Sequence, residues 1–154
     1  MQVEKVDVKE IERIVEKNYG AKIDLSKYNA YINKEGKIFL SSKGIEKKLI
    51  EISTRIGIYF GKIKRNEKIQ LSVEGSQIVG KNATKNVAIL DEKNIYKFME
   101  GLSVVPAKLL KCEEHNFVIV SNGKDFFGSG IYSNGEIRSM VSKGRRIYTS
   151  IRKI

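Results

Sequence analysis

Cys112 and His115 are the only cysteine and the only histidine of the chain, and they lie three positions apart. One residue of each type cannot supply the four ligands that a structural zinc site requires. A Cys–His nucleophile pair is formally possible, but Glu113 and Glu114 lie between them, and nearby negative charge raises a thiol pKa. We therefore expect a partly buried cysteine beside a solvated acidic turn, with no metal site and no internal disulfide.

The sequence also lacks the other common motifs of catalytic and nucleotide-binding sites. Gly128-Ser129-Gly130 lacks the Gly-x-Ser-x-Gly spacing and the strand-to-helix context of a nucleophile elbow. The sequence contains neither a Walker phosphate loop nor a dinucleotide-binding fingerprint, and no pair of carboxylates is set apart as a general acid and base. We expect the chain not to be an enzyme, with no catalytic residue and no cofactor.

Positive charge gathers at the C-terminal end, where no acidic residue follows Glu136. Arginine binds phosphates through paired donors, and each neutralised phosphate releases counterions, which makes such binding strong and salt-sensitive. Tyr132 and Tyr148 lie near these charges and could stack unpaired bases, although a strand tyrosine is more often half-buried in a core. The candidate RNA-binding residues are Lys143, Arg145, Arg146, Arg152 and Lys153.

The composition supports an acidic partner. The 154 residues are 41% apolar, enough for a core, and carry 29 basic against 18 acidic side chains, a formal net charge of +11. This imbalance favours nucleic acid over a membrane surface. A second basic group is assigned to solubility or a partner contact: Lys62, Lys64, Arg65 and Lys68. No targeting or membrane-spanning stretch is recognisable, so we expect a cytoplasmic protein.

The first half alternates helical and extended patterns. Asp7 with Glu10 predicts a helix N-terminus, and Gly20 predicts its end. Ser41-Ser42 should cap a second helix reaching about Thr54, with its buried face formed by Ile45, Leu49, Ile52 and Ile56. Antiparallel strand pairs are predicted at 27–32 with 37–40 and at 58–63 with 68–73, followed by a helical turn at 77–79.

A polar segment at 80–85 indicates a domain boundary, so we divide the chain into residues 1–82 and 83–154. In the second part, Asp91 should cap a helix whose apolar face is Ile95, Phe98, Met99 and Leu102. Two Asn-Gly turns then predict a three-stranded meander over 117–141. Gly128 and Gly130 in its middle strand indicate a bend or a close approach to the backbone.

These segments resemble a known family. The second half resembles a PUA domain through Phe127-Gly128-Ser129-Gly130-Ile131, followed by a hairpin and a basic end. The first half resembles the pre-PUA domain of the Nip-seven ribosome biogenesis factors through Lys37-Ile38-Phe39-Leu40-Ser41 and Gly57-Ile58-Tyr59-Phe60-Gly61-Lys62. The resemblance implies an α+β protein of archaeal type. An N-terminal mixed α/β pre-PUA domain with an antiparallel sheet would precede a C-terminal PUA pseudobarrel.

The resemblance also implies a function. Such a protein would be a monomeric, non-catalytic factor in pre-rRNA processing and large-subunit assembly, acting with other ribosome assembly or exosome-type RNA-processing proteins. It would bind single-stranded uridine-rich or A/U-rich RNA through the basic PUA surface. Two alternatives remain open: an accessory module or subunit of a tRNA or rRNA modification system, and a protein–protein adaptor with only non-specific RNA affinity.

Overall fold

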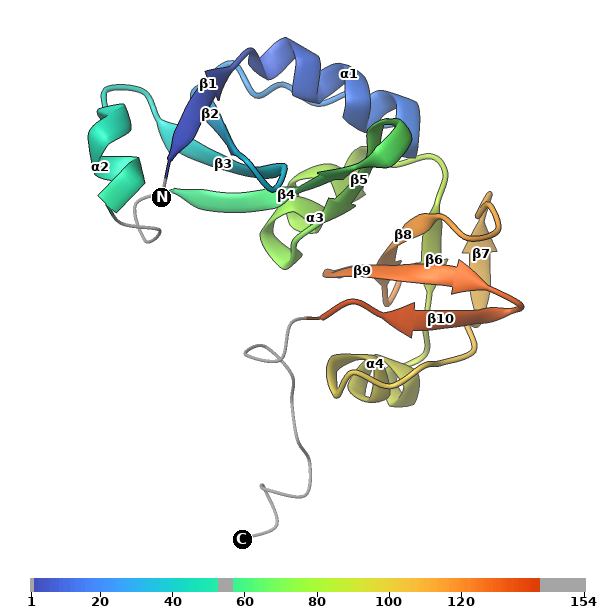
Figure 1. Cartoon of the computed structure of the whole chain (residues 1–154). Helices are drawn as coiled ribbons and strands as arrows, with labels where there is room; N and C mark the ends of the chain where they lie inside the picture. The colour runs from blue at the N-terminus through green and yellow to red at the C-terminus, as the bar shows by residue number, and fades with distance from the viewer. Residues whose placement is uncertain (1, 53–56, 142–154) are drawn as a thin grey trace, which may run out of the picture.

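The computed structural model describes residues 2–52 and 57–141, which form two five-stranded sheets with helices packed around them (Figure 1). The first sheet has the order β1-β2-β3-β4-β5 and is antiparallel throughout. Its strands are β1 (Val3–Val6), β2 (Tyr28–Asn33), β3 (Lys37–Ser42), β4 (Ile58–Lys64) and β5 (Lys68–Leu71). Both predicted hairpins are therefore confirmed. The N-terminal strand β1 was not predicted, because a four-residue strand containing two charged residues gives almost no alternation signal.

The first predicted helix is confirmed as α1 (Val8–Tyr19). The Asp7 side chain caps it by accepting from the Lys9 amide at 3.0 Å, and Gly20 ends it in the left-handed conformation at φ 61°. Glu10 does not complete a capping box with Asp7 but pairs with Arg13. The buried side of α1 covers one face of the first sheet (Figure 1).

The second predicted helix is wrong in its start and in its buried face. Ser41 and Ser42 end strand β3, where they pair with β2, so their backbone groups are committed to the sheet. The helix α2 (Lys47–Ile52) begins only afterwards. It buries Ile50 against Val3 and Tyr31, whereas Leu49 is 41% and Ile52 73% exposed. Ile56 lies outside the described residues.

A short turn and a helix connect the first sheet to the second. The segment between the strands predicted at 58–63 and 68–73 forms the one-turn helix η1 (Arg65–Glu67). The predicted helical turn is part of α3 (Val73–Val79), which is capped by Ser72. The one-turn helix η2 (Gly80–Asn82) follows. α3 contacts both β4 and β9, so it lies between the two sheets.

The second sheet has the order β10-β9-β8-β6-β7 and contains one parallel pair, β6 with β8. Its strands are β6 (Val87–Ile89), β7 (Lys108–Leu110), β8 (Phe117–Ser121), β9 (Phe126–Ser133) and β10 (Glu136–Ser139). The predicted meander is confirmed, while β7 was missed. At the first turn only Gly123 has a positive φ, because the Asn122 side chain accepts from two following amides instead. At the second, Asn134 and Gly135 both have positive φ, as predicted.

The helix α4 (Glu92–Met99) lies at the far end of the second sheet (Figure 1). Asp91 caps it as predicted, by accepting from the Asn94 amide at 2.8 Å. Leu102 was expected on its buried face but is 49% exposed, because the helix ends before it. No helix in the described part of the chain is long and apolar enough to cross a bilayer.

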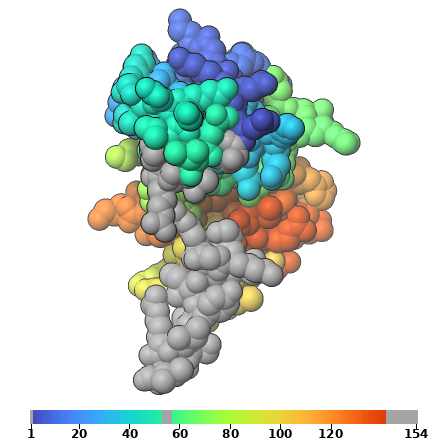
Figure 2. Space-filling view, turned by 60° about the vertical axis from the view of Figure 1, so that its left-hand side comes forward, coloured from blue at the N-terminus to red at the C-terminus, as the bar shows by residue number. Residues whose placement is uncertain are grey.

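The two halves share a hydrophobic core. Val87 and Ile119 of the second sheet belong to the same buried cluster as Leu40, Phe60 and Leu71 of the first. Figure 2 shows the blue-to-cyan atoms of the first half packed directly above the orange-to-red atoms of the second. The division at residues 82 and 83 remains a prediction.

Candidate nucleic-acid interface

The five basic residues predicted to bind RNA lie outside the described residues: Lys143, Arg145, Arg146, Arg152 and Lys153. Tyr148 does so too. Tyr132 is described, and it is partly buried and packs against the core of the second half. This is the ordinary role of a strand tyrosine.

Cys112 and His115 do not form a nucleophile pair in the structure. The Cys112 Sγ lies 3.2 Å from the Val87 carbonyl oxygen, and burial raises the thiol pKa to about 11. His115 has a positive φ of 66°, and its Nδ1 lies 3.3 Å from the Ser133 hydroxyl. The expectation of a partly buried cysteine is met, with burial rather than the neighbouring glutamates as the main cause of its pKa. Within residues 2–52 and 57–141, no three His, Cys, Asp or Glu side chains gather as a metal site would require.

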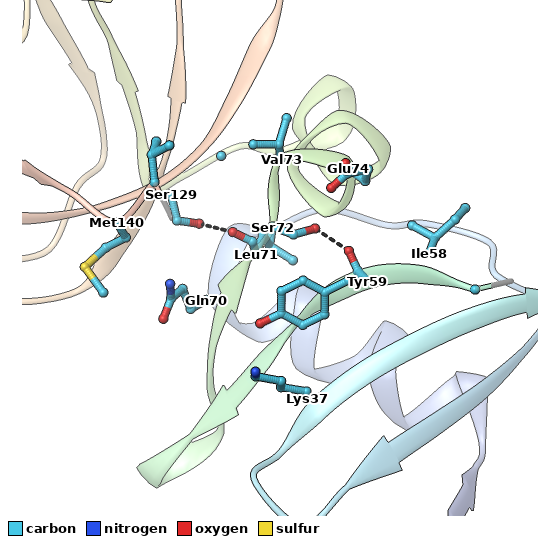
Figure 3. Close-up of a pocket in the computed structure, with 13 residues that line it drawn as sticks. Lys37, Ile58, Tyr59, Gln70, Leu71, Ser72, Val73, Glu74, Ser129 and Met140 are labelled. Carbon is cyan, nitrogen blue, oxygen red and sulfur yellow. Dashed lines mark hydrogen bonds between the residues drawn. The ribbon is translucent and has the colours of Figure 1, made fainter. Parts of the chain in front are cut away.

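A cleft of about 520 Å³ lies where the two halves meet, and we call it the junction cleft. Figure 3 shows the Tyr59 ring beside Lys37 and Gln70, with Ser129 and Met140 across the cleft. The first sheet and the start of α3 form one wall, and the first half of β9 with the residues after β10 forms the other. The lining residues are Lys37, Gly57, Ile58, Tyr59, Gln70, Leu71, Ser72, Val73, Glu74, Gly128, Ser129, Met140 and Val141.

Gly128 and Ser129, which line this cleft, attach β9 of the second sheet to α3 and to β5 of the first sheet. The Gly128 amide donates to the Ser76 hydroxyl at 2.9 Å, and the Ser129 hydroxyl donates to the Leu71 carbonyl at 2.7 Å. Gly128 has a φ of +99°, and a Cβ on it would lie 3.3 Å from Val73. A Cβ on Gly130 would lie 2.4 Å from the Ile137 side chain. The predicted close approach is therefore real, and what approaches Gly128 is α3.

Four lysines share the face of the first sheet that opens into the junction cleft, and we call this surface the lysine face: Lys37, Lys62, Lys64 and Lys68. Lys37 pairs with Lys62 across β3 and β4, and Lys64 pairs with Lys68 across β4 and β5. Opposed residues of an antiparallel pair point to the same side, and so do residues two apart on one strand. The opposite side carries Ile38, Ile63 and Ile69 and packs against α1. Arg65 lies in the turn at the end of this face and is exposed.

A β-bulge places Tyr59 on the lysine face. Ile38 pairs with Gly61 and Phe39 pairs with Tyr59, which leaves Phe60 as the extra residue on β4. Strict alternation from Lys62 would have directed Phe60 toward the lysines and Tyr59 into the core. With the bulge, Phe60 is fully buried in the core and Tyr59 lines the cleft, as bulges near binding sites often arrange.

Two contacts hold this bulge. The Ser72 hydroxyl donates to the Tyr59 carbonyl, and the Ser72 amide donates to the Phe60 carbonyl at 3.0 Å. Gly61 permits the approach of β5, since a Cβ there would lie 2.7 Å from the Gln70 carbonyl oxygen. The Tyr59 ring packs against Phe39 with centroids 5.6 Å apart, so its orientation is supported from one side.

The lysine face has few compensating charges. Lys37 forms an ion pair with Glu35, with 3.8 Å between its Nζ and the Glu35 Oε2. Lys62, Lys64 and Lys68 form no ion pair with any carboxylate of the described residues. The pKa of Lys64 is lowered, first by the loss of part of its hydration and then by Lys62. Like charges directly opposite each other destabilise a sheet, and here two such pairs are adjacent. This arrangement suits a bound anion.

From the sequence, Lys62, Lys64 and Lys68 were assigned to solubility or a partner contact and were not connected with Lys37 or Tyr59. The missing information is the bulge, which changes the face on which Tyr59 lies. Gly61, a glycine inside an otherwise regular strand pattern, was the signal for it.

Comparison with known proteins identifies a solved structure with the same fold. No family model matches the chain, and no curated protein matches it. Among solved structures, a conserved PUA domain protein from Thermoplasma acidophilum is similar over 99% of this chain and 99% of its own, with a TM-score of 0.61 at 14% identity. The expected fold class is thereby confirmed: the described chain has the fold of a PUA domain protein, with an antiparallel sheet in its N-terminal part.

Proposed function

We propose that this protein is a non-catalytic RNA-binding protein. The observation that carries the proposal is a full-length PUA-type fold on a chain with a formal net charge of +11. PUA domains are named for RNA-modifying enzymes, and excess lysine and arginine give affinity for a phosphate backbone. The non-catalytic role rests on the sequence, which provides no pairing of catalytic groups.

A more specific role follows from the sequence resemblance to the Nip-seven factors. On this proposal the protein acts in the cytoplasm in pre-rRNA processing and large-subunit assembly, beside other assembly or exosome-type proteins. It binds uridine-rich or A/U-rich single strands through Lys143, Arg145, Arg146, Arg152 and Lys153. Lys143 follows Val141, a lining residue of the junction cleft, by two positions in the sequence.

The test is a titration of the full chain with a short oligouridylate, a short oligocytidylate and duplex DNA at two salt concentrations. We expect saturable binding to the oligouridylate that persists at the higher salt, because base contacts add to the electrostatic attraction. Equal and weak binding of all three that disappears with salt would contradict the proposal and favour the adaptor alternative. Replacing Arg145, Arg146 and Arg152 together by alanine tests the predicted C-terminal site in the same assay.

A further inference from the structure

We propose that the lysine face and the junction cleft form a second binding site for single-stranded RNA, in which one unstacked base lies against Tyr59 and the adjoining phosphates contact Lys62, Lys64 and Lys68. The inference rests on the proposed RNA-binding function and assigns part of it to the first sheet. It gives a ligand to a surface that the sequence had connected only with solubility or a partner.

The charge arrangement indicates a polyanion. Lys62 and Lys64 are two residues apart on β4, and Lys68 lies opposite Lys64 on β5, so the three ammonium groups belong to one continuous patch. A single small anion would engage one or two of them, whereas a phosphodiester chain can engage all three. Each contact would release counterions, which favours binding most strongly at low salt.

The aromatic residue and the cleft indicate an unstacked base. One side of the Tyr59 ring packs against Phe39, and the ring lines a cleft of about 520 Å³, within the range that holds small organic ligands. The Gln70 side chain beside the ring has both donors and an acceptor, the groups that recognise a base edge. A duplex presents no free base face to such a ring, so a single strand fits and a double helix does not.

The positions of the lysines and of Tyr59 indicate how the RNA would lie. Lys62, Lys64 and Lys68 lie on β4 and β5, and the Tyr59 ring lines the cleft. The RNA backbone is therefore expected over β4 and β5, with the base directed into the cleft. An acidic peptide would pair with the lysines but carries no nucleobase to stack on the tyrosine ring.

The chain contains no tryptophan, so Tyr59→Trp creates a single fluorescent reporter on the lysine face. We expect its fluorescence to be quenched on titration with a short oligouridylate, because a stacked base quenches an indole. Tyr96→Trp is the matched control, since Tyr96 is 45% exposed on α4, away from the cleft. Quenching at position 59 and not at 96 supports the site. The site would be overturned if RNA binding is seen by another method while position 59 shows no quenching, or only as much quenching as position 96.

Two further variants separate the base contact from the phosphate contacts. Tyr59→Leu should weaken oligouridylate binding roughly 5- to 100-fold through lost stacking, whereas Tyr59→Phe should retain most of the affinity. The triple variant Lys62→Gln, Lys64→Gln, Lys68→Gln should reduce the slope of log affinity against log salt by about 2. The control with the same charge change is Lys9→Gln, Lys22→Gln, Lys81→Gln, three exposed lysines away from the lysine face.

The outcomes distinguish this site from the proposed function. If the unaltered chain binds no RNA, both fail. If it binds RNA and the two triple variants lose the same affinity and slope, only the lysine-face site is wrong, and RNA binding then depends on other residues. Equally tight binding of a polyglutamate peptide, abolished by the Lys62, Lys64 and Lys68 changes, would also overturn the site and identify it as a protein contact.

Discussion

The two faces of the first sheet are built from the same strands and meet opposite requirements. One face is covered by α1 and buries Ile38, Leu40 and Ile69 completely. The other face carries the four lysines and Tyr59 at the junction cleft. Burial of apolar surface explains why the covered face stabilises the fold. The opposed lysines of the other face repel each other and destabilise the sheet, a cost that the proposed RNA binding would explain.

The strongest test of this difference uses two adjacent residues. Phe60→Ala should lower the free energy of unfolding by about 3–5 kcal/mol, because it empties a fully buried site on the covered face. Tyr59→Ala should cost only about 1 kcal/mol, because that ring is partly exposed at the cleft. Urea denaturation of both variants measures the values. Equal losses would show that the bulge does not separate the two faces.

A smaller effect is expected from the glycine that permits the bulge. In Gly61→Ala the new methyl group would lie 2.7 Å from the Gln70 carbonyl oxygen and 3.1 Å from the Leu71 Cα, both in the backbone. We expect a loss of about 1–3 kcal/mol by denaturation and weaker oligouridylate binding, since Tyr59 must shift with its strand. Gly123→Ala provides a comparison in open space, although its positive φ also carries a cost. Unchanged stability in Gly61→Ala would contradict the described bulge geometry.

The smallest effect should have the opposite sign. Lys64→Thr removes a charge that faces Lys68 and neighbours Lys62, so it should stabilise the fold by about 0.2–1 kcal/mol at low salt. The gain should shrink as salt screens the repulsion. Lys5→Thr controls for the strand preference of threonine, because Lys5 faces Tyr31 and no lysine. A similar change in melting temperature for both variants would mean that the repulsion is unimportant.

Local sequence signals were sufficient where one short segment determines its own structure. Asp7, Gly20 and Asp91 delimit helices through contacts made within a few residues, and all three were predicted. Asn134-Gly135 sets its hairpin for the same reason. Elements that depend on distant partners were not predicted. Strand β1 forms because β2 pairs with it. Ser41 and Ser42 are part of strand β3, and not of a helix, because they also pair with β2.

The candidate site was the least predictable part. It combines β3, β4 and β5 with residues from β9 and the segment after β10, which the sequence separates widely. The C-terminal basic residues were proposed from charge alone and stay a prediction, whereas the lysine face requires the register of three strands. The position of Tyr59 also depends on one extra residue in β4, which reverses the face assigned by alternation.

The hydrogen bonds of Gly128 and Ser129 have a consequence for how the molecule unfolds. They join β9 to Ser76 and Leu71, and the surrounding hydrophobic cluster takes side chains from both sheets. Separating the halves would expose Val87 and Ile119 to water and leave the Ser129 hydroxyl without its carbonyl partner. Unfolding one sheet while the other stays folded is therefore costly in free energy. We expect one cooperative unfolding transition for the whole described chain.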